Sequence, residues 1–70
     1  MEQKRRLLKD ELPDILTAQN ISDYLVISRR RVYELLQLSE ELGGIRCLEI
    51  GASKRVEKED FLRWIEVKKN

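Results

Sequence analysis

Three consecutive arginines, Arg29 to Arg31, follow Ser28 and open a segment with helical periodicity. Cations at the N-terminus of a helix oppose the macrodipole and cost roughly 0.3 to 1 kcal/mol each at exposed sites. A phosphate would reverse the sign of this penalty, because the helix terminus and the arginines attract the same anion. A basic run is most often only a solvated face, but this position favours a site that binds phosphate.

The face of this helix that points away from its apolar residues carries three polar side chains, Arg30, Glu34 and Gln37. Arginine can hydrogen-bond guanine through O6 and N7, glutamine can pair with adenine, and glutamate can accept from the N4 amino group of cytosine. Arg29 and Tyr33 lie on one shoulder and Arg31 on the other. The face is therefore suited to base edges, although Arg30 and Glu34 could instead form a surface i,i+4 ion pair.

A second basic cluster, Ser53-Lys54-Arg55, lies at a predicted hairpin. A basic two-stranded wing beside a pair of helices can reach phosphates or the adjacent minor groove. An ordinary hairpin with solvated charges explains the same residues equally well, so both interpretations stay open.

Two short helices must position these side chains. Thr17 has the character of an N-cap, and the helix expected over 18–25 places Ala18, Ile21 and Leu25 on one face. Ser28 is a second N-cap, and the apolar stripe of the next helix extends to about Leu42. Gly43 and Gly44 then end that helix.

Three further elements complete the domain. Ile15-Leu16 is a short apolar entry that could form a strand, and residues 45–50 are strand-like, with Leu48 and Ile50 expected to face the core. Residues 51–54 turn the chain into a second strand at Arg55-Val56, and a final helix begins near Lys58. The predicted fold class is α+β and mostly helical, a small winged helix-turn-helix with a two-stranded wing and a C-terminal helix. Residues 1–14 are expected to be a flexible or partly helical arm, and 15–70 the DNA-binding domain.

Composition limits the function classes. The 70 residues carry a net charge of +1, no histidine and one cysteine, Cys47, so a zinc site of the usual Cys/His kind, an intrachain disulfide and histidine-dependent catalysis are excluded. No apolar run is long enough to span a membrane. We therefore expect a non-enzymatic cytoplasmic protein without cofactor or metal.

Residues 16–65 resemble the excisionase-type DNA-binding domain, a small winged helix related to the MerR group. The matching segments are Leu16-Thr17, Ile27-Ser28-Arg29, Val32-Tyr33, Glu49-Ile50-Gly51, Arg55-Val56, Glu59-Asp60-Phe61 and Trp64-Ile65. Val26 stands where the family commonly has glycine, so we expect a differently built turn, since β-branched residues disfavour positive φ. The segment 37–44 is longer than usual and is similar to the excisionases of phages and conjugative transposons.

The resemblance implies a protein that binds and bends double-stranded DNA, assists a tyrosine-family integrase in excising a mobile element, self-associates on DNA and is associated with the bacterial nucleoid. The candidate DNA-contacting residues are Thr17, Ser28, Arg29, Arg30, Arg31, Tyr33, Glu34, Gln37, Ser53, Lys54 and Arg55. A small phage or plasmid transcriptional regulator would use the same surface. A different class is a protein-interaction module such as an anti-repressor, using Leu7, Leu8 and the acidic pair Glu40-Glu41.

Overall fold

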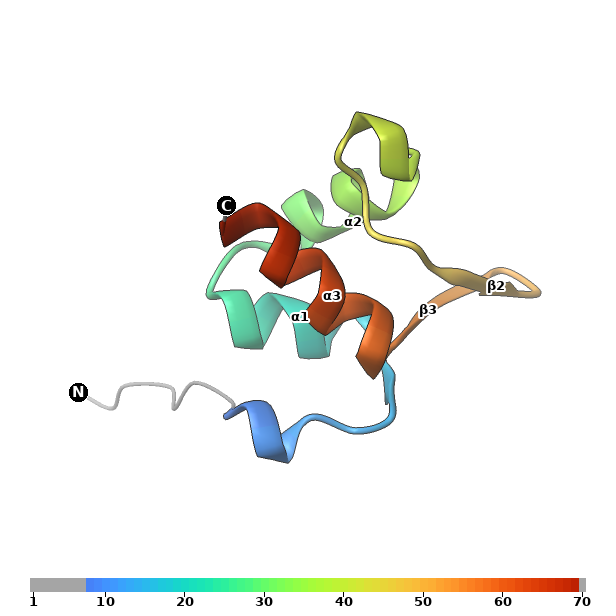
Figure 1. The fold of residues 1–70 in the computed structure, drawn as a ribbon. Coiled ribbons are helices and arrows are strands. Elements are labelled where there is room, and N and C mark those ends of the chain that lie inside the picture. The colour runs from blue at the N-terminus through green and yellow to red at the C-terminus, as the bar shows by residue number, and fades with distance from the viewer. Residues whose placement is uncertain (1–7, 70) are drawn as a thin grey trace.

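A three-stranded antiparallel sheet lies beside three α-helices, and two of its strands extend beyond the helices as a hairpin (Figure 1). The computed structural model describes residues 8–69. Its elements in chain order are the 3-10 turn η1 (Lys9–Glu11), β1 (Ile15–Leu16), α1 (Ala18–Leu25), α2 (Arg29–Gln37), the 3-10 turn η2 (Glu40–Leu42), β2 (Leu48–Ile50), β3 (Ser53–Glu57) and α3 (Lys58–Lys69). This is the predicted α+β winged helix-turn-helix, with β2 and β3 as the wing.

Helix α1 begins where the sequence predicts. The backbone N–H of Asn20 donates to Thr17 Oγ1 at 3.1 Å, and the backbone N–H of Thr17 donates to Asn20 Oδ1 at 2.9 Å. This reciprocal arrangement is a capping box, which satisfies two backbone donors at the helix start. The helix buries Ala18 and Ile21 and ends at Leu25, as expected.

The turn between α1 and α2 keeps the left-handed geometry that the sequence argued against. Val26 has φ 57° and ψ 49°, so the expectation of a differently built turn is wrong. The turn is held by two hydrogen bonds between Ser22 and Ile27: the Ile27 N–H donates to Ser22 O at 3.2 Å, and Ser22 Oγ donates to Ile27 O at 2.6 Å. Local bonding therefore imposes a conformation that a β-branched residue disfavours.

Helix α2 is shorter than predicted. It ends at Gln37 rather than near Leu42, because Leu38 is extended (φ −77°, ψ 144°) and the chain then forms the separate turn η2. In a longer helix, the Leu35 carbonyl oxygen would accept from a backbone N–H one turn further along. Here it accepts from the Ile45 N–H at 3.1 Å, where the chain comes back past the end of α2. A periodic sequence cannot reveal this tertiary hydrogen bond.

The core lies between the sheet and the helices. Its buried hydrophobic residues are Leu12, Leu16, Ala18, Ile21, Val32, Leu36, Ile45, Val56 and Phe61. Phe61 of α3 is fully buried, with the Tyr24 ring edge-on at 5.6 Å and the Trp64 ring stacked at 6.2 Å between centroids. Trp64 Nε1 also donates to Gly43 O at 3.1 Å and so fastens the α2–β2 connection to α3.

The wing strand β2 (Leu48–Ile50) is shorter than the strand expected over 45–50, and its aliphatic side chains do not point into the core. Leu48 and Ile50, which we expected to face the core, are 42% and 62% exposed. Leu48 pairs with Arg55 in the antiparallel register, whereas the core position of β3 is the next residue, Val56. Because neighbouring strand residues point to opposite faces, the register places Leu48 and Ile50 on the face opposite the buried Val56.

The segment before β1 is attached to the domain at Leu12 and Asp14. Leu12 is buried in the core, and the Lys58 N–H donates to Asp14 O at 2.8 Å, which joins this segment to the start of α3. Half of the arm predicted over 1–14, residues 1–7 with Leu7, lies outside the described residues. Within residues 8–69 no helix is long and apolar enough to cross a bilayer.

Candidate nucleic-acid interface

A surface hollow of about 260 Å³ lies between the start of α1, one side of α2 and the wing. Its lining residues are Thr17, Ala18, Gln19, Arg29, Tyr33, Ala52, Ser53, Lys54 and Arg55. Six of the residues selected from the sequence thus lie together around one concavity, although they come from three separate segments. We call this concavity, with its nine lining residues, the helix–wing hollow.

The cap of α2 forms as predicted. The Arg31 N–H donates to Ser28 Oγ at 3.2 Å, and the Val32 N–H donates to Ser28 O at 3.2 Å. The first turn of α2 holds no acidic residue that could offset its arginines there. Arg29 and Arg30 are exposed and take part in no ion pair among residues 8–69. Both guanidinium groups are therefore available to an anion.

The ion pair on α2 differs from the one considered from the sequence. Glu34 Oε1 lies 3.9 Å from Arg31 Nη1, an i,i+3 contact, so the alternative pairing of Glu34 with Arg30 does not form. Both partners are more than half exposed, and such pairs contribute about 0 to 1 kcal/mol. Arg30 and Gln37 are exposed on the outer face of α2 and lie outside the helix–wing hollow. Arg30 forms no ion pair among residues 8–69.

The wing holds an ion pair that the sequence analysis missed. Lys54 Nζ donates to Glu49 Oε2 at 2.9 Å, directly across the strand pairing of residues 49 and 54. The hydrogen bond and the positive charge of Lys54 lower the pKa of Glu49, and the same hydrogen bond raises the pKa of Lys54. The turn predicted over 51–54 and the strand predicted at Arg55-Val56 are wrong in extent, because β3 begins at Ser53 and the turn has only two residues, Gly51 and Ala52. This shorter turn sets the register that places Glu49 opposite Lys54.

Arg55 lies beside this pair. Its Nη1 donates to the backbone oxygen of Lys54 at 2.9 Å, which holds the guanidinium close to its own strand. Arg55 and Ser53 lie on the opposite face of β3 from Lys54, since successive residues alternate. The wing therefore presents a cation on each face, one neutralised by Glu49 and one held only by the backbone.

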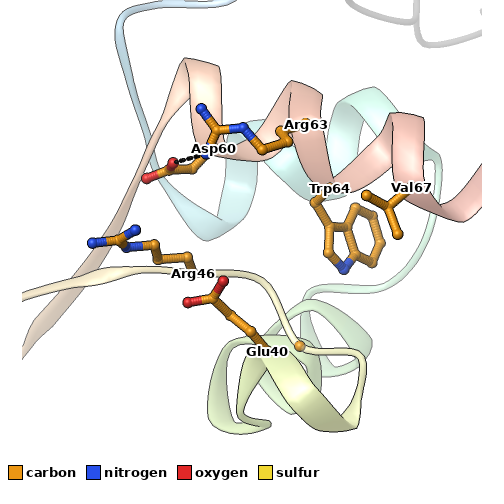
Figure 2. Close-up of a pocket in the computed structure, with 7 residues that line it drawn as sticks. Glu40, Arg46, Asp60, Arg63, Trp64 and Val67 are labelled. Atoms are coloured by element: carbon orange, nitrogen blue, oxygen red, sulfur yellow. Dashed lines mark hydrogen bonds and ion pairs between the residues drawn. The ribbon is translucent and has the colours of Figure 1, made fainter.

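A second hollow, of about 150 Å³, lies between η2 and α3 (Figure 2). The labelled side chains around it are Glu40, Arg46, Asp60, Arg63, Trp64 and Val67. Three of these side chains already have partners: Arg63 Nη1 donates to Asp60 Oδ1 at 3.2 Å, and Trp64 Nε1 donates to Gly43 O. Of these two hydrogen bonds, only the one from Trp64 to Gly43 joins α3 to the segment between α2 and β2. None of the candidate DNA-contacting residues lines this hollow, whereas Glu40, named for the protein-interaction alternative, does.

Metal chemistry finds no support in residues 8–69, where no group of three or more potential metal-binding side chains gathers. Cys47 is partly buried, with Sγ 3.7 Å from Leu36 O, and its structural contact suffices to explain it. The chain matches no family model, no characterised protein and no solved structure.

Proposed function

We propose that this chain binds double-stranded DNA sequence-specifically, with α2 in the major groove and the wing at the adjacent minor groove. The observation that carries the proposal is that α2 residues Arg29 and Tyr33 share one hollow with Lys54 and Arg55 of the wing. A helix and a basic hairpin that border one concavity can bind the same stretch of sugar-phosphate backbone from two sides.

The start of α1 adds to this backbone contact. Ala18 and Gln19 occupy its first turn, where backbone N–H groups lack helical acceptors, and both residues line the helix–wing hollow together with Thr17. Arg29 and Lys54 supply positive charge at the same hollow. We assign the hollow to backbone phosphate and the outer face of α2, with Arg30, Glu34 and Gln37, to base edges.

The narrower role we propose rests on the resemblance to excisionases. The protein would act as a recombination directionality factor, binding and bending DNA near the ends of a mobile element, self-associating there and assisting a tyrosine-family integrase. A nucleoid location follows from this role. A small transcriptional regulator would use the same DNA surface, and an excision assay with and without the protein separates the two.

The experiment that tests DNA binding is selection of duplexes from a randomised pool, followed by affinity measurements at several salt concentrations. If about five phosphates are neutralised, log K falls against log salt with a slope near −4 to −5. The Arg29→Ala/Arg30→Ala/Arg31→Ala variant should lose selective binding. A Lys68→Ala/Lys69→Ala variant serves as control, because it removes cations from the last turn of α3, far from the wing (Figure 1).

A flat salt response, or wild-type affinity in the triple variant, would refute the DNA proposal. The protein-interaction alternative then gains weight, since Leu8 is 55% exposed and Glu40 and Glu41 lie on the surface. This alternative predicts a protein–protein complex that forms without DNA. The double variant Glu40→Lys/Glu41→Lys should abolish that complex, and the triple arginine variant should still form it.

A further inference from the structure

One face of the wing combines exposed aliphatic side chains with a cation. Leu48 and Ile50 of β2 lie on the same side of the hairpin as their cross-strand partners, Arg55 and Ser53. This face lies opposite the buried Val56, and its residues Ser53 and Arg55 line the helix–wing hollow. Leu48 and Ile50 therefore remain partly exposed to water, and they do not belong to the buried core.

Ile50 lies at the end of the hairpin. It directly precedes the two turn residues Gly51 and Ala52, and Gly51 adopts φ +61°, the pattern of a type II′ turn with glycine first. Figure 1 shows this turn as the point of the wing farthest from the helices. At 62% exposure Ile50 is the most exposed aliphatic residue of the sheet.

An exposed apolar edge strand is a liability that proteins usually limit with charge. Strand β2 carries one charge, Glu49, and Lys54 already engages it. The strand is three residues long, so little backbone is offered to another strand. No free charge on β2 therefore offsets the exposed side chain of Ile50. A binding partner that covers this side chain would explain why an isoleucine stands at this position.

We propose that Ile50 enters the minor groove of the bound duplex as an apolar contact and kinks the DNA at that step. The inference rests on the proposed DNA binding and names the group that deforms the duplex. Two features select DNA as the occupant: Lys54 and Arg55 flank the tip with positive charge, and the wing continues directly from the helix–wing hollow. Minor-groove proteins insert aliphatic side chains between base steps in the same way.

The contact also confers a preference without hydrogen bonds to bases. Pyrimidine–purine steps such as TA unstack and kink most easily, so an inserted aliphatic group favours duplexes that have such a step beneath the wing. The outer face of α2 selects one segment of the site, and Ile50 selects a deformable segment in the neighbouring minor groove.

The test uses the selected duplex with a fluorescent donor and acceptor at its two ends. Wild-type protein should shorten the end-to-end distance, and Ile50→Ala should lose most of this shortening while affinity falls about 3- to 10-fold. The salt slope should stay unchanged, because no charge is removed. Ile50→Met should restore bending, and Leu42→Ala is the control, an aliphatic residue 72% exposed on η2.

Unchanged bending and affinity in Ile50→Ala would overturn the inference while leaving DNA binding intact. A second overturning result is that Ile50→Ala abolishes self-association in sedimentation but binds and bends DNA like wild type, since the tip would then contact another copy. Failure of wild-type protein to select any duplex would instead refute the proposed function itself. Circular dichroism melts of all variants separate these outcomes from unfolding.

Discussion

Glu49 and Lys54 face each other across the two strands of the wing and form an ion pair, 2.9 Å from Nζ to Oε2. Lys54 also lines the helix–wing hollow, where phosphate is proposed to bind. A phosphate bound there as proposed would compete with the carboxylate for one ammonium group. We therefore expect Glu49 to weaken the wing as an anion site, while its ion pair with Lys54 adds a cross-strand contact to the hairpin.

Replacing Glu49 with glutamine should strengthen binding to DNA of any sequence. The change removes a negative charge from the surface and frees Lys54 for phosphate. We expect the salt slope to become steeper by about one unit, with a several-fold gain in affinity at low salt. In the double variant Glu49→Gln/Lys54→Gln the gain should vanish. Tighter binding that persists in the double variant would contradict the competition.

The same pair predicts a pH effect on wing stability. Lys54 holds the pKa of Glu49 below its ordinary value, so the contribution of Glu49 is complete above its unfolded-state pKa and is lost as pH falls through the lowered pKa. The raised pKa of Lys54 acts at the other end: that contribution is complete below the unfolded-state value and is lost as pH rises through the raised pKa. NMR titration should show the Glu49 carboxyl titrating at higher pH in Lys54→Gln. Identical titration in both proteins would mean that the pair does not persist in solution.

Val26→Gly should stabilise the protein. Val26 has φ 57°, a region that costs a residue with a Cβ about 1 to 2 kcal/mol, and its side chain is 71% exposed, so little packing is lost. After the entropy cost of glycine, the free energy of unfolding should rise by up to about 1 kcal/mol. Val67→Gly is a matched control with opposite sign, because Val67 is 65% exposed within α3. Urea denaturation measures both, and destabilisation by Val26→Gly would show that the valine side chain is needed.

Gly44→Ala should destabilise the protein by more than about 2 kcal/mol. A Cβ at Gly44 would overlap the carbonyl oxygen of Leu38, and this backbone cannot move without breaking the chain's return toward β2. Gly51→Ala meets no atom within 4 Å and should cost only about 1 kcal/mol for its φ of +61°. Thermal melts test the ranking. Equal losses at both glycines would indicate that close packing is not the cause at Gly44.

Arg30→Ala and Lys54→Ala should separate base contacts from phosphate contacts. Arg30 lies on the outer face of α2 with no ion pair among residues 8–69, so its loss should cost about 1 to 3 kcal/mol on the selected duplex and relax base preference. Lys54→Ala should weaken all duplexes alike and flatten the salt slope by at most about one unit, because Glu49 already engages part of its charge. Parallel losses on selected and random duplexes in both variants would refute the division.

Local sequence was sufficient for the elements whose signals are local. The caps at Thr17 and Ser28 depend on hydrogen bonds within three residues, and the structure forms both. The extent of α1 and the start of α3 follow from apolar spacing and first-turn acids, and they are where the sequence predicts. The site residues on α2 share faces as expected, because 3.6-residue periodicity alone assigns those faces.

Only the tertiary structure decided the end of α2, the facing of β2 and the partner of Lys54. The helix ends at Gln37 because a backbone donor at Ile45, distant in sequence, takes a carbonyl that a longer helix would have used. The facing of Leu48 and Ile50 depends on strand register, where a shift of one residue exchanges the two faces. The sequence by itself determined which residues carry charge and where helices begin, since these follow from short-range bonding. The pairing of β2 with β3 decided which charged side chains lie close together, as Glu49 and Lys54 do.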